Sequence, residues 1–427
     1  NILPIVVMYL LFFMIAFVTN LCNPMAVIVK NNFAMSNFAA QLGNAANFIA
    51  YAAMGIPAGM LLKKIGYRKT ALVAILVGFV GVFLQYMSGW AAIQSFWVYL
   101  AGAFTAGFCM CMLNTVVNPM LNTLGGGGNK GNQLVQFGGV CNSLAAVLVT
   151  IIMGSLIADA TKAQIADATP ALMIALGVFA FAFIVLLLVK IPEPSLESEK
   201  VNVENEKKYS AFSFRHFNLG ILAIFLYMGV EVGVPTYVMQ YLTTSPEAAT
   251  PGLGINAGIV GMIVAVYWLL MLIGRLLGGM IGGKVSSRAQ ITSVSIFCLV
   301  LVLLGMFLPA DVMVKMPGVD WATLTVMTAQ VPVGVFALIL VGLCTSVMWG
   351  GIFNMAVEGL GKYTSIASGA FMTMVCGGGI LIPLQGKLAD VFGNFQMSYI
   401  VVLVCTAYIL FYALVGSKNV NKNIPTE

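Results

Sequence analysis

An acidic residue, Glu231, stands in the middle of an apolar stretch that is long enough to cross a lipid bilayer. The stretch runs from Phe225 to Tyr241, and no Lys or Arg lies within a helical turn or two of the carboxylate. An ionised carboxylate at the centre of a membrane helix costs roughly 2.5–3.5 kcal/mol on insertion scales. Such a group is retained where it faces a polar cavity, meets a partner or takes up a proton. Glu231 therefore predicts a membrane protein with a polar path through its middle, and such a path favours transport.

Side-chain amides recur at helical spacing in several other apolar stretches. Residues three or four apart share one face of a helix. Asn and Gln each supply a hydrogen-bond donor and an acceptor without the cost of burying a charge, which suits the hydroxyl groups of a sugar. Taken singly, each amide is equally well explained by a helix–helix hydrogen bond worth about 0.6 kcal/mol. Together they predict one polar cavity, and the candidate substrate-binding amides are Asn20, Asn23, Asn47, Asn114, Asn118, Gln136, Asn142 and Asn354.

Two tryptophans, Trp268 and Trp349, lie away from the interfacial belts where Trp usually collects. An indole ring beside the amides would stack against the flat C–H face of a sugar, and we include both residues, with Glu231, among the candidate substrate contacts. Simple packing is the alternative, most of all for Trp268. Arg275 is expected near the cytoplasmic end of its span, where pairing or snorkelling as part of a gate is favoured over contact with substrate.

Composition argues against a soluble protein. Apolar residues make up 60% of the 427 residues, charged residues only 8%, and the mean hydropathy is +1.00, whereas soluble domains carry about 25% charged residues. The eight cysteines are scattered through the apolar stretches and the single histidine, His216, has no metal-ligand companions, so we expect no metal or cofactor. No nucleophile–base–acid set is evident, which argues against an enzyme. The net charge of +6 is dispersed among short loops, which favours membrane orientation over binding of nucleic acid.

Apolar spans fill nearly the whole chain. Because Lys and Arg gather in the loops that follow the even-numbered spans, the positive-inside rule predicts that both termini lie in the cytoplasm. The twelve predicted spans are 3–29, 39–62, 70–89, 96–122, 133–157, 171–190, 217–243, 255–282, 289–309, 331–357, 365–387 and 396–416.

The polar segment 191–215 divides these spans into two sets of six. It reads as a cytoplasmic linker that would let two bundles move relative to each other, although a passive tether explains it equally well. An internal repeat supports two halves, since residues 115–125 align without gaps on residues 351–361. Parallel repeats of this kind place substrate at the interface between the halves. We predict an N-terminal six-helix bundle (1–190), the linker (191–215) and a C-terminal six-helix bundle (216–427).

Several segments resemble a known group. The segment from Gly59 to Lys69 is similar to the loop motif of the major facilitator superfamily, although Lys63 replaces its usual Asp. Over nearly all of both halves the chain resembles the fucose permease and glucose/galactose transporter family of bacterial sugar:proton symporters, and the Glu231 segment leans towards the glucose/galactose branch. The most telling pieces are residues 55–59, 118–119, 142–143, 225–232 and 377–386.

The resemblance also implies roles for individual residues. Asn23 and Asn114 stand where the fucose-permease pattern has acids, the first of which serves proton coupling, and Gly139 stands where it has a polar side chain. The loss of both acids leaves Glu231 as the candidate coupling acid. Positions of the family's cavity fall on Asn20, Asn118, Gln136 and Trp349.

We therefore expect an all-α membrane protein with twelve transmembrane helices in two six-helix bundles, the major facilitator fold. The leading hypothesis is alternating-access import of a glucose- or galactose-like hexose across the bacterial inner membrane, with Glu231 carrying the coupling proton. The expected partners are the sugar and the lipid bilayer, with no nucleic acid, and the expected oligomeric state is a monomer. A sugar uniporter without ion coupling, an exporter of amphipathic compounds and a non-transporting sensor are the alternatives.

Overall fold

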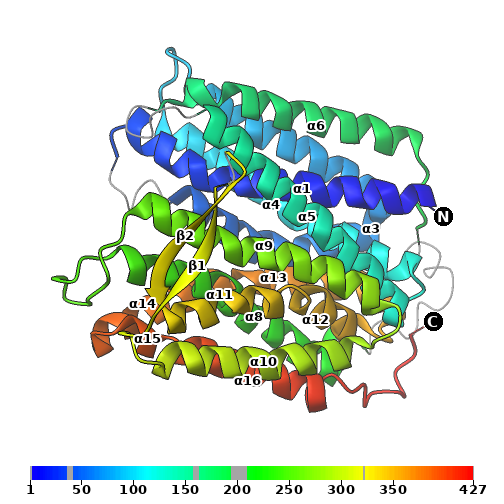
Figure 1. The fold of residues 1–427 in the computed structure, drawn as a ribbon. Helices are drawn as coiled ribbons and strands as arrows, with labels where there is room; N and C mark the ends of the chain where they lie inside the picture. The colour runs from blue at the N-terminus through cyan, green and yellow to red at the C-terminus, as the bar shows by residue number, and fades with distance from the viewer. Residues whose placement is uncertain (1, 36–41, 157–162, 194–208, 321–322, 427) are drawn as a thin grey trace.

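The computed structural model describes residues 2–35, 42–156, 163–193, 209–320 and 323–426. Long helices run side by side along the length of the molecule, and both chain ends lie at the same end of the helices (Figure 1). The helices of the first part of the chain are α1 (Ile2–Asn32), α3 (Leu42–Met87), α4 (Phe96–Leu124), α5 (Gly128–Leu156) and α6 (Thr169–Leu188), with the short η1 (Ile165–Ala168) before α6.

The second part of the chain has shorter and more interrupted helices. Its described helical elements are η3 (Ala211–Ser213), α8 (Arg215–Thr243), α9 (Ala257–Gly282), α10 (Ser287–Phe307), α11 (Val333–Thr345), α12 (Met348–Val357), η4 (Gly361–Tyr363), α13 (Thr364–Thr373), η5 (Met374–Gly377), α14 (Gly378–Phe392), α15 (Phe395–Ser398), α16 (Ile400–Phe411) and the π-helical turn η6 (Tyr412–Gly416).

The helices confirm the predicted membrane architecture. Within the described residues, 11 helical stretches are long and apolar enough to cross a bilayer. One of them, α3, contains 46 residues and joins the predicted second and third spans across a break at Gly66. That residue has φ 84° and ψ 176°, a conformation that is essentially restricted to glycine. With α3 counted as two spans, the total agrees with the twelve expected.

Two predicted spans are broken near their middles. The tenth consists of α11 and α12, which meet at Ser346 and Val347. The eleventh consists of α13, the 3₁₀ turn η5 and α14. Broken helices leave backbone carbonyl groups without an intrahelical partner, and in a membrane such groups must be satisfied by neighbouring helices or by water.

A β-hairpin is an element that the sequence did not lead us to expect. Strands β1 (Met313–Asp320) and β2 (Thr325–Pro332) pair antiparallel, with Met313 opposite Pro332 and Asp320 opposite Thr325. The hairpin occupies the connection between α10 and α11, at the end of the molecule away from the chain termini (Figure 1). The predicted start of the tenth span at residue 331 is therefore two residues early, because β2 continues to Pro332.

Buried apolar side chains form two clusters. One is drawn from residues between Val7 and Ile191, and the other from residues between Ala211 and Ala413, joined by Cys111. The predicted linker, 191–215, falls largely on residues 194–208, which lie outside the described part of the chain.

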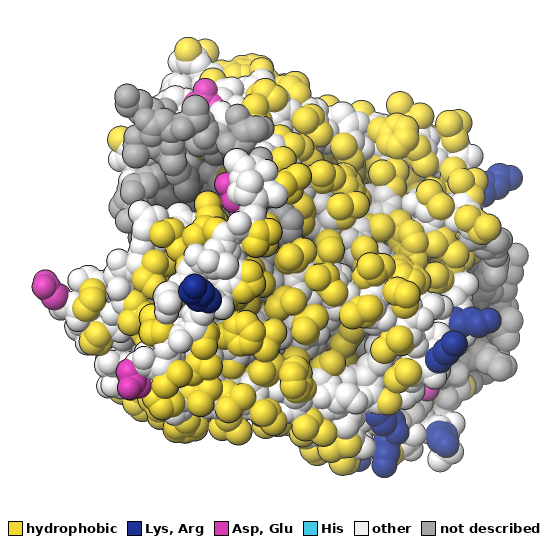
Figure 2. Space-filling view, viewed as in Figure 1, with side chains coloured by type: hydrophobic (Ala, Val, Ile, Leu, Met, Phe, Trp, Pro, Cys, Tyr) yellow, Lys and Arg dark blue, Asp and Glu magenta, His cyan; other side chains and the backbone are white. Residues whose placement is uncertain are grey.

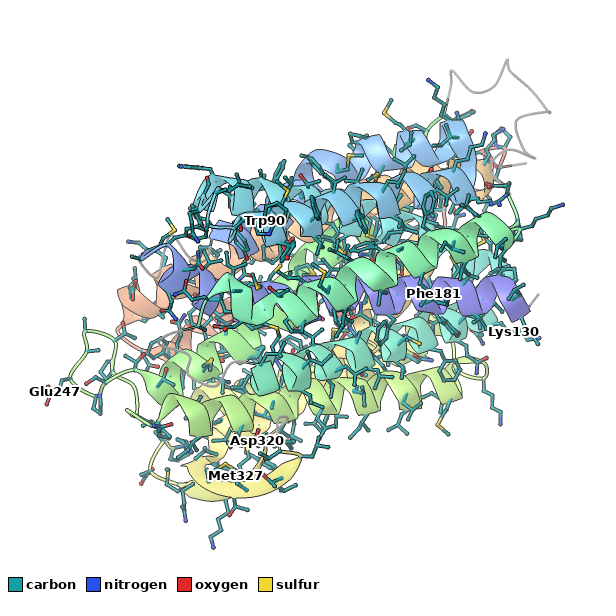
Figure 3. The ribbon with its side chains drawn as sticks, turned by 90° about the horizontal axis from the view of Figure 1, so that it is seen from above. Trp90, Lys130, Phe181, Glu247, Asp320 and Met327 are labelled. Carbon is teal, nitrogen blue, oxygen red and sulfur yellow. The ribbon has the colours of Figure 1, made fainter. Side chains whose placement is uncertain are left out.

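The outer surface is predominantly apolar, as Figure 2 shows for one face. The Lys and Arg side chains visible there gather mainly at the end that carries the chain termini, and the view from above places Lys130 and Glu247 at opposite ends (Figure 3). We call the end with the termini and Lys130 the basic end. A wide apolar band with basic residues at one edge is typical of a protein that spans a lipid bilayer.

Candidate functional site

Glu231 has a charged partner on the neighbouring helix. Glu231 lies in the middle of α8, and its Oε1 is 3.6 Å from Nη2 of Arg275 on α9. The exposed fractions of the two side chains are 14% for Glu231 and 11% for Arg275. Of the two roles expected for Arg275, snorkelling and pairing, the structure shows a pair, and the guanidinium reaches the carboxylate at mid-helix.

The same guanidinium also contacts α5, which belongs to the first part of the chain. Nη1 of Arg275 donates a hydrogen bond to Oγ of Ser143 over 2.7 Å and another to the carbonyl oxygen of Gly139 over 3.2 Å. A Cβ atom at Gly139 would lie 3.1 Å from Cδ of Arg275. Because Gly139 has no side chain, the Arg275 side chain can lie directly against α5 at this position. One cation thus connects α9, the carboxylate on α8 and the backbone of α5.

Ser143 was not among the predicted site residues. It is buried, whereas the neighbouring candidate Asn142 is half-buried. Its spacing of four residues from Gly139 puts both on one face of α5. Only the position of Arg275 reveals why that face matters.

A second polar group links α3, α4 and α12. Nε1 of Trp349 donates to Oδ1 of Asn118 over 3.3 Å, and Nδ2 of Asn118 donates to the backbone oxygen of Asn114 over 2.9 Å. Nδ2 of Asn114 in turn donates to the hydroxyl of Tyr51 over 2.8 Å. Three of the predicted residues are thus brought together, and Tyr51 joins them.

Aromatic rings surround the half-buried indole of Trp349. The ring centroids of Tyr227 and Phe371 lie 6.3 and 5.9 Å from it, and both of these neighbours are fully buried. Tyr227 is on α8, one helical turn before Glu231, so the aromatic cluster and the ion pair lie next to each other along this helix. An aromatic wall beside amides and a carboxylate is the chemistry that a sugar ring requires.

Two predicted amides hold helices together. Nε2 of Gln136 donates to the carbonyl oxygen of Val347 over 2.9 Å and thereby satisfies a group at the break between α11 and α12. Asn354 donates through Nδ2 to Oγ of Ser287 over 2.7 Å and accepts a hydrogen bond from Asn122. For Gln136 and Asn354 the geometry favours the helix–helix alternative over contact with substrate.

The remaining candidates are spread along α1, α3 and α9. Asn20 donates to its own helix at Ala16, and Nδ2 of Asn47 lies 3.1 Å from Sγ of Cys22. Asn23 lies in α1, but its side chain is outside the described part of the structure. Thr19, which we did not predict, is exposed in the middle of α1, although residues 14–18 are all buried.

Trp268 is 41% exposed and packs edge-on against Tyr267, with 5.1 Å between ring centroids. It precedes Arg275 by seven residues, which is close to two helical turns, and therefore shares the face of α9 that Arg275 turns towards α5. Trp268 does not belong to the cluster around Trp349, and its place is two turns further from the basic end.

The helices of the two parts of the chain meet closely at the basic end. A Cβ atom at Gly59 of α3 would lie 2.8 Å from the carbonyl oxygen of Ser365 and 3.1 Å from Cα of Gly369, both on α13. Ser368 donates to the carbonyl oxygen of Thr115 on α4 over 3.0 Å. Gln133 near the start of α5 donates to Gly279 near the end of α9 over 2.9 Å. With the Asn122–Asn354 bond, these contacts close the molecule at this end.

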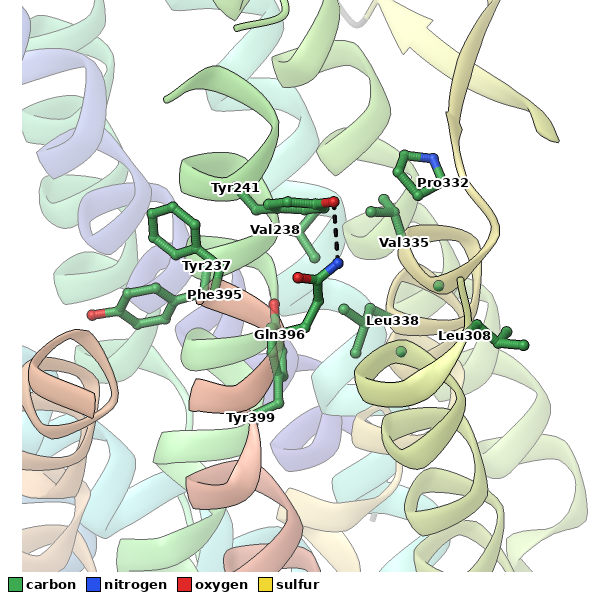
Figure 4. Close-up of a pocket in the computed structure, with 12 residues that line it drawn as sticks. Tyr237, Val238, Tyr241, Leu308, Pro332, Val335, Leu338, Phe395, Gln396 and Tyr399 are labelled. Carbon is green, nitrogen blue, oxygen red and sulfur yellow. Dashed lines mark hydrogen bonds between the residues drawn. The ribbon is translucent and has the colours of Figure 1, made fainter. Parts of the chain in front are cut away.

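A separate small cavity lies within the second part of the chain, towards the end away from the termini (Figure 4). Tyr237, Tyr241 and Tyr399 line it together with Gln396, whose Nε2 donates to the hydroxyl of Tyr241 over 3.1 Å. Its interior is on the scale of about one water molecule. Neither Glu231 nor Trp349 borders it, so it is not the site described above.

The sequence pattern of the major facilitator superfamily matches residues 8–383. The chain belongs to this superfamily. It is therefore a multi-pass membrane protein, and the predicted major facilitator fold is confirmed.

Individual proteins extend this assignment. The chain is 27% identical over 415 residues to a glucose/galactose transporter of Brucella abortus, covering 96% of this chain and 93% of that protein. It is 23% identical over 443 residues to the L-fucose-proton symporter of Escherichia coli, covering 98% and 94%. The crystal structure of the transporter FucP in the outward conformation matches 97% of this chain and 99% of its own length, with a TM-score of 0.80 and 22% identity. The resemblance predicted from motifs is confirmed, and these proteins are named as transporters, not enzymes.

Proposed function

We propose that this superfamily member carries a glucose- or galactose-like hexose across the bacterial inner membrane by alternating access, coupled to the movement of protons. The observation that supports this most is the Glu231–Arg275 pair, which also reaches Gly139 and Ser143 on α5. A charged pair at mid-membrane is costly and is retained mainly for function. The names of the relatives, a glucose/galactose transporter and a fucose-proton symporter, agree with this choice of cargo and ion.

The proposed coupling uses the charge state of Glu231. When the carboxylate is ionised it attracts Arg275, and the arginine keeps its hydrogen bonds to Ser143 and Gly139 across the interface. Uptake of a proton by Glu231 removes this attraction. Arg275 is then no longer held by α8, and its guanidinium is free to leave Ser143 and Gly139 on α5. Release of the proton on the opposite side restores the attraction. Protonation is thereby connected to the contact that must break when the two parts of the chain separate.

The proposed sugar site lies beside this pair. Trp349, in its aromatic surroundings, would face the C–H groups of the ring, and Asn114 and Asn118 would bind hydroxyl groups. Asn20, Asn142 and Trp268 are further contacts from α1, α5 and α9.

The proposal also includes the organisation of the chain in the membrane. The two bundles are residues 1–190 and 216–427, the protein acts as a monomer, and both termini are cytoplasmic. In this orientation, the closed basic end is the cytoplasmic end of the protein.

Uptake into proteoliposomes tests the proposal. With an inward proton gradient, labelled glucose or galactose should accumulate above the external concentration, and sugar addition should make a weakly buffered medium more alkaline. Uptake without accumulation or alkalinisation would indicate the uniporter. Failure of all hexoses, together with drug sensitivity of a deletion strain, would favour the exporter of amphipathic compounds.

Replacing Trp349 with Ala is expected to weaken sugar binding by roughly two- to tenfold, because aromatic stacking contributes about 0.5–1.5 kcal/mol. Phe at this position should retain most of the affinity. Binding would be measured by titrating purified protein with sugar. Trp97→Ala is the matched control, since Trp97 is 74% exposed at the start of α4. Equal loss in the Trp349 and Trp97 variants would contradict a contact with sugar.

The proposed orientation predicts which loops face outwards. Lys315 lies on the β-hairpin and Lys284 follows α9, and both side chains are exposed. In intact cells, a membrane-impermeant thiol reagent should label Lys315→Cys but reach Lys284→Cys only after permeabilisation. The unsubstituted protein gives the background from its native cysteines. The reverse pattern would place both termini outside.

A further inference from the structure

A cleft of about 480 Å³ lies between the break in α3 and the end of α6, apart from the residues that we assign to transport. Three basic side chains line it, from Arg68, Lys69 and Lys190, with one acid, Glu193. At neutral pH these four groups carry a net charge of two positive units. The aliphatic residues Ile65, Leu72, Leu187 and Ile191 complete the wall.

The acid and the arginine already have partners in the backbone. The two carboxylate oxygens of Glu193 accept hydrogen bonds from the backbone N–H groups of Tyr67 and Arg68, over 2.6 and 3.0 Å. Arg68 donates through Nε to the carbonyl oxygen of Leu186 over 2.8 Å and through Nη2 to that of Leu187 over 2.6 Å. These bonds use two of the five N–H groups of the arginine. They fix the basic wall of the cleft in place while leaving its positive charge.

The apolar wall continues onto the lipid-facing surface. Leu76 and Val80 on the second arm of α3 and Ile184 and Leu188 on α6 are all exposed. The cleft therefore lies where an exposed apolar surface meets basic side chains at the basic end of the molecule. A soluble anion needs only the charges, whereas a phospholipid needs charges for its headgroup and an apolar surface for its chains. The combination favours the lipid.

We propose that this cleft binds the headgroup of an anionic phospholipid from the leaflet next to the basic loops. Lys69 and Lys190 contact the phosphate, Arg68 adds its fixed positive charge, and Leu72 and Leu187 contact the first part of the acyl chains. Both lysine side chains are exposed, so they can adjust to the headgroup.

Native mass spectrometry of the full-length, delipidated protein tests the site. Phosphatidylglycerol would be added back in parallel with phosphatidylcholine, and its binding compared between the unsubstituted protein and the double variant Lys69→Gln/Lys190→Gln. The control, Lys284→Gln/Lys418→Gln, removes the same charge from exposed positions at the basic end of the second part of the chain. Arg68 is left intact because it holds the end of α6.

We expect phosphatidylglycerol to bind about tenfold more weakly to the cleft variant, because the variant loses both lysine charges that contact the phosphate. The control variant should bind like the unsubstituted protein. Equal weakening in both variants, or equal binding of phosphatidylcholine, would overturn the proposal. Full competition by inorganic phosphate would also overturn it and would identify a site for a free anion instead.

Discussion

Replacing Glu231 with Gln is expected to abolish the accumulation of sugar against its gradient, while movement of sugar down its gradient is retained. Gln has the size and hydrogen-bonding capacity of the acid but cannot carry a proton at physiological pH. The variant therefore removes the proposed coupling step without removing a contact to sugar hydroxyl groups. Proteoliposomes with and without a proton gradient would separate the two activities. Glu247→Gln is the matched control, because Glu247 is exposed in the loop after α8, at the end of the molecule opposite Lys130 (Figure 3).

Concentrative uptake by the Glu231→Gln variant at the rate of the unsubstituted protein would remove Glu231 from the coupling mechanism.

Stability measurements provide an independent check of the Glu231–Arg275 pair. Loss of one partner from a buried ion pair typically costs about 3–5 kcal/mol, because the other charge stays unpaired. Arg275→Gln should therefore lower the thermal unfolding temperature, and Glu231→Gln in the same chain should restore much of the loss. Restored stability without restored accumulation would separate the structural role of the pair from its role in coupling.

Replacing Gly369 with Ala is expected to reduce transport by about tenfold or more, because overpacking of a tight contact costs roughly 1–3 kcal/mol. A Cβ atom there would lie 2.7 Å from both Cα and N of Gly59. Backbone atoms cannot move aside as a flexible side chain can, so α13 and α3 would have to separate at the basic end. The closed state would be destabilised relative to the state that is open at this end. Initial rates of sugar uptake would measure the loss.

Gly177→Ala in α6 is the control for this change. A Cβ atom at Gly177 would have no neighbour within 4 Å among the described residues. Both substitutions raise helix propensity by a similar amount, so a difference between them reports the contact and not the helix. The accessibility of Asn122→Cys to a thiol reagent should rise in the Gly369→Ala background, since Asn122 contacts Asn354 at the closed end. Uptake by Gly369→Ala at the rate of the Gly177→Ala control would show that this closure is not part of the transport cycle.

The membrane-spanning segments could be predicted from the sequence, because a helix that crosses the lipid needs a minimum length of apolar residues. The same rule could not reveal the β-hairpin, since 313–332 lies between spans, where no such constraint applies. Nor could it show that the second and third spans form one helical element across Gly66, because a glycine conformation depends on how the flanking helices pack.

Individual site residues were harder to assign. An amide in a membrane helix bonds equally well to a sugar or to another helix, and the sequence does not state which partner is near. Trp349, Asn114 and Asn118 proved to be neighbours. Gln136 and Asn354, which have the same chemistry, instead connect broken or ending helices. Ser143 and Thr19 carry too weak a signal in sequence to be chosen among many Ser and Thr residues.

The sequence by itself determined that this chain spans a membrane many times and that it buries an acid at mid-membrane, because hydropathy and charge are properties of each residue. Only the tertiary structure decided that Arg275 is the partner of that acid and that Gly139 makes room for it on α5. Pairing across helices depends on how the spans pack and rotate against one another. That packing is a collective result of all the helices, so no local pattern around Glu231 contains it.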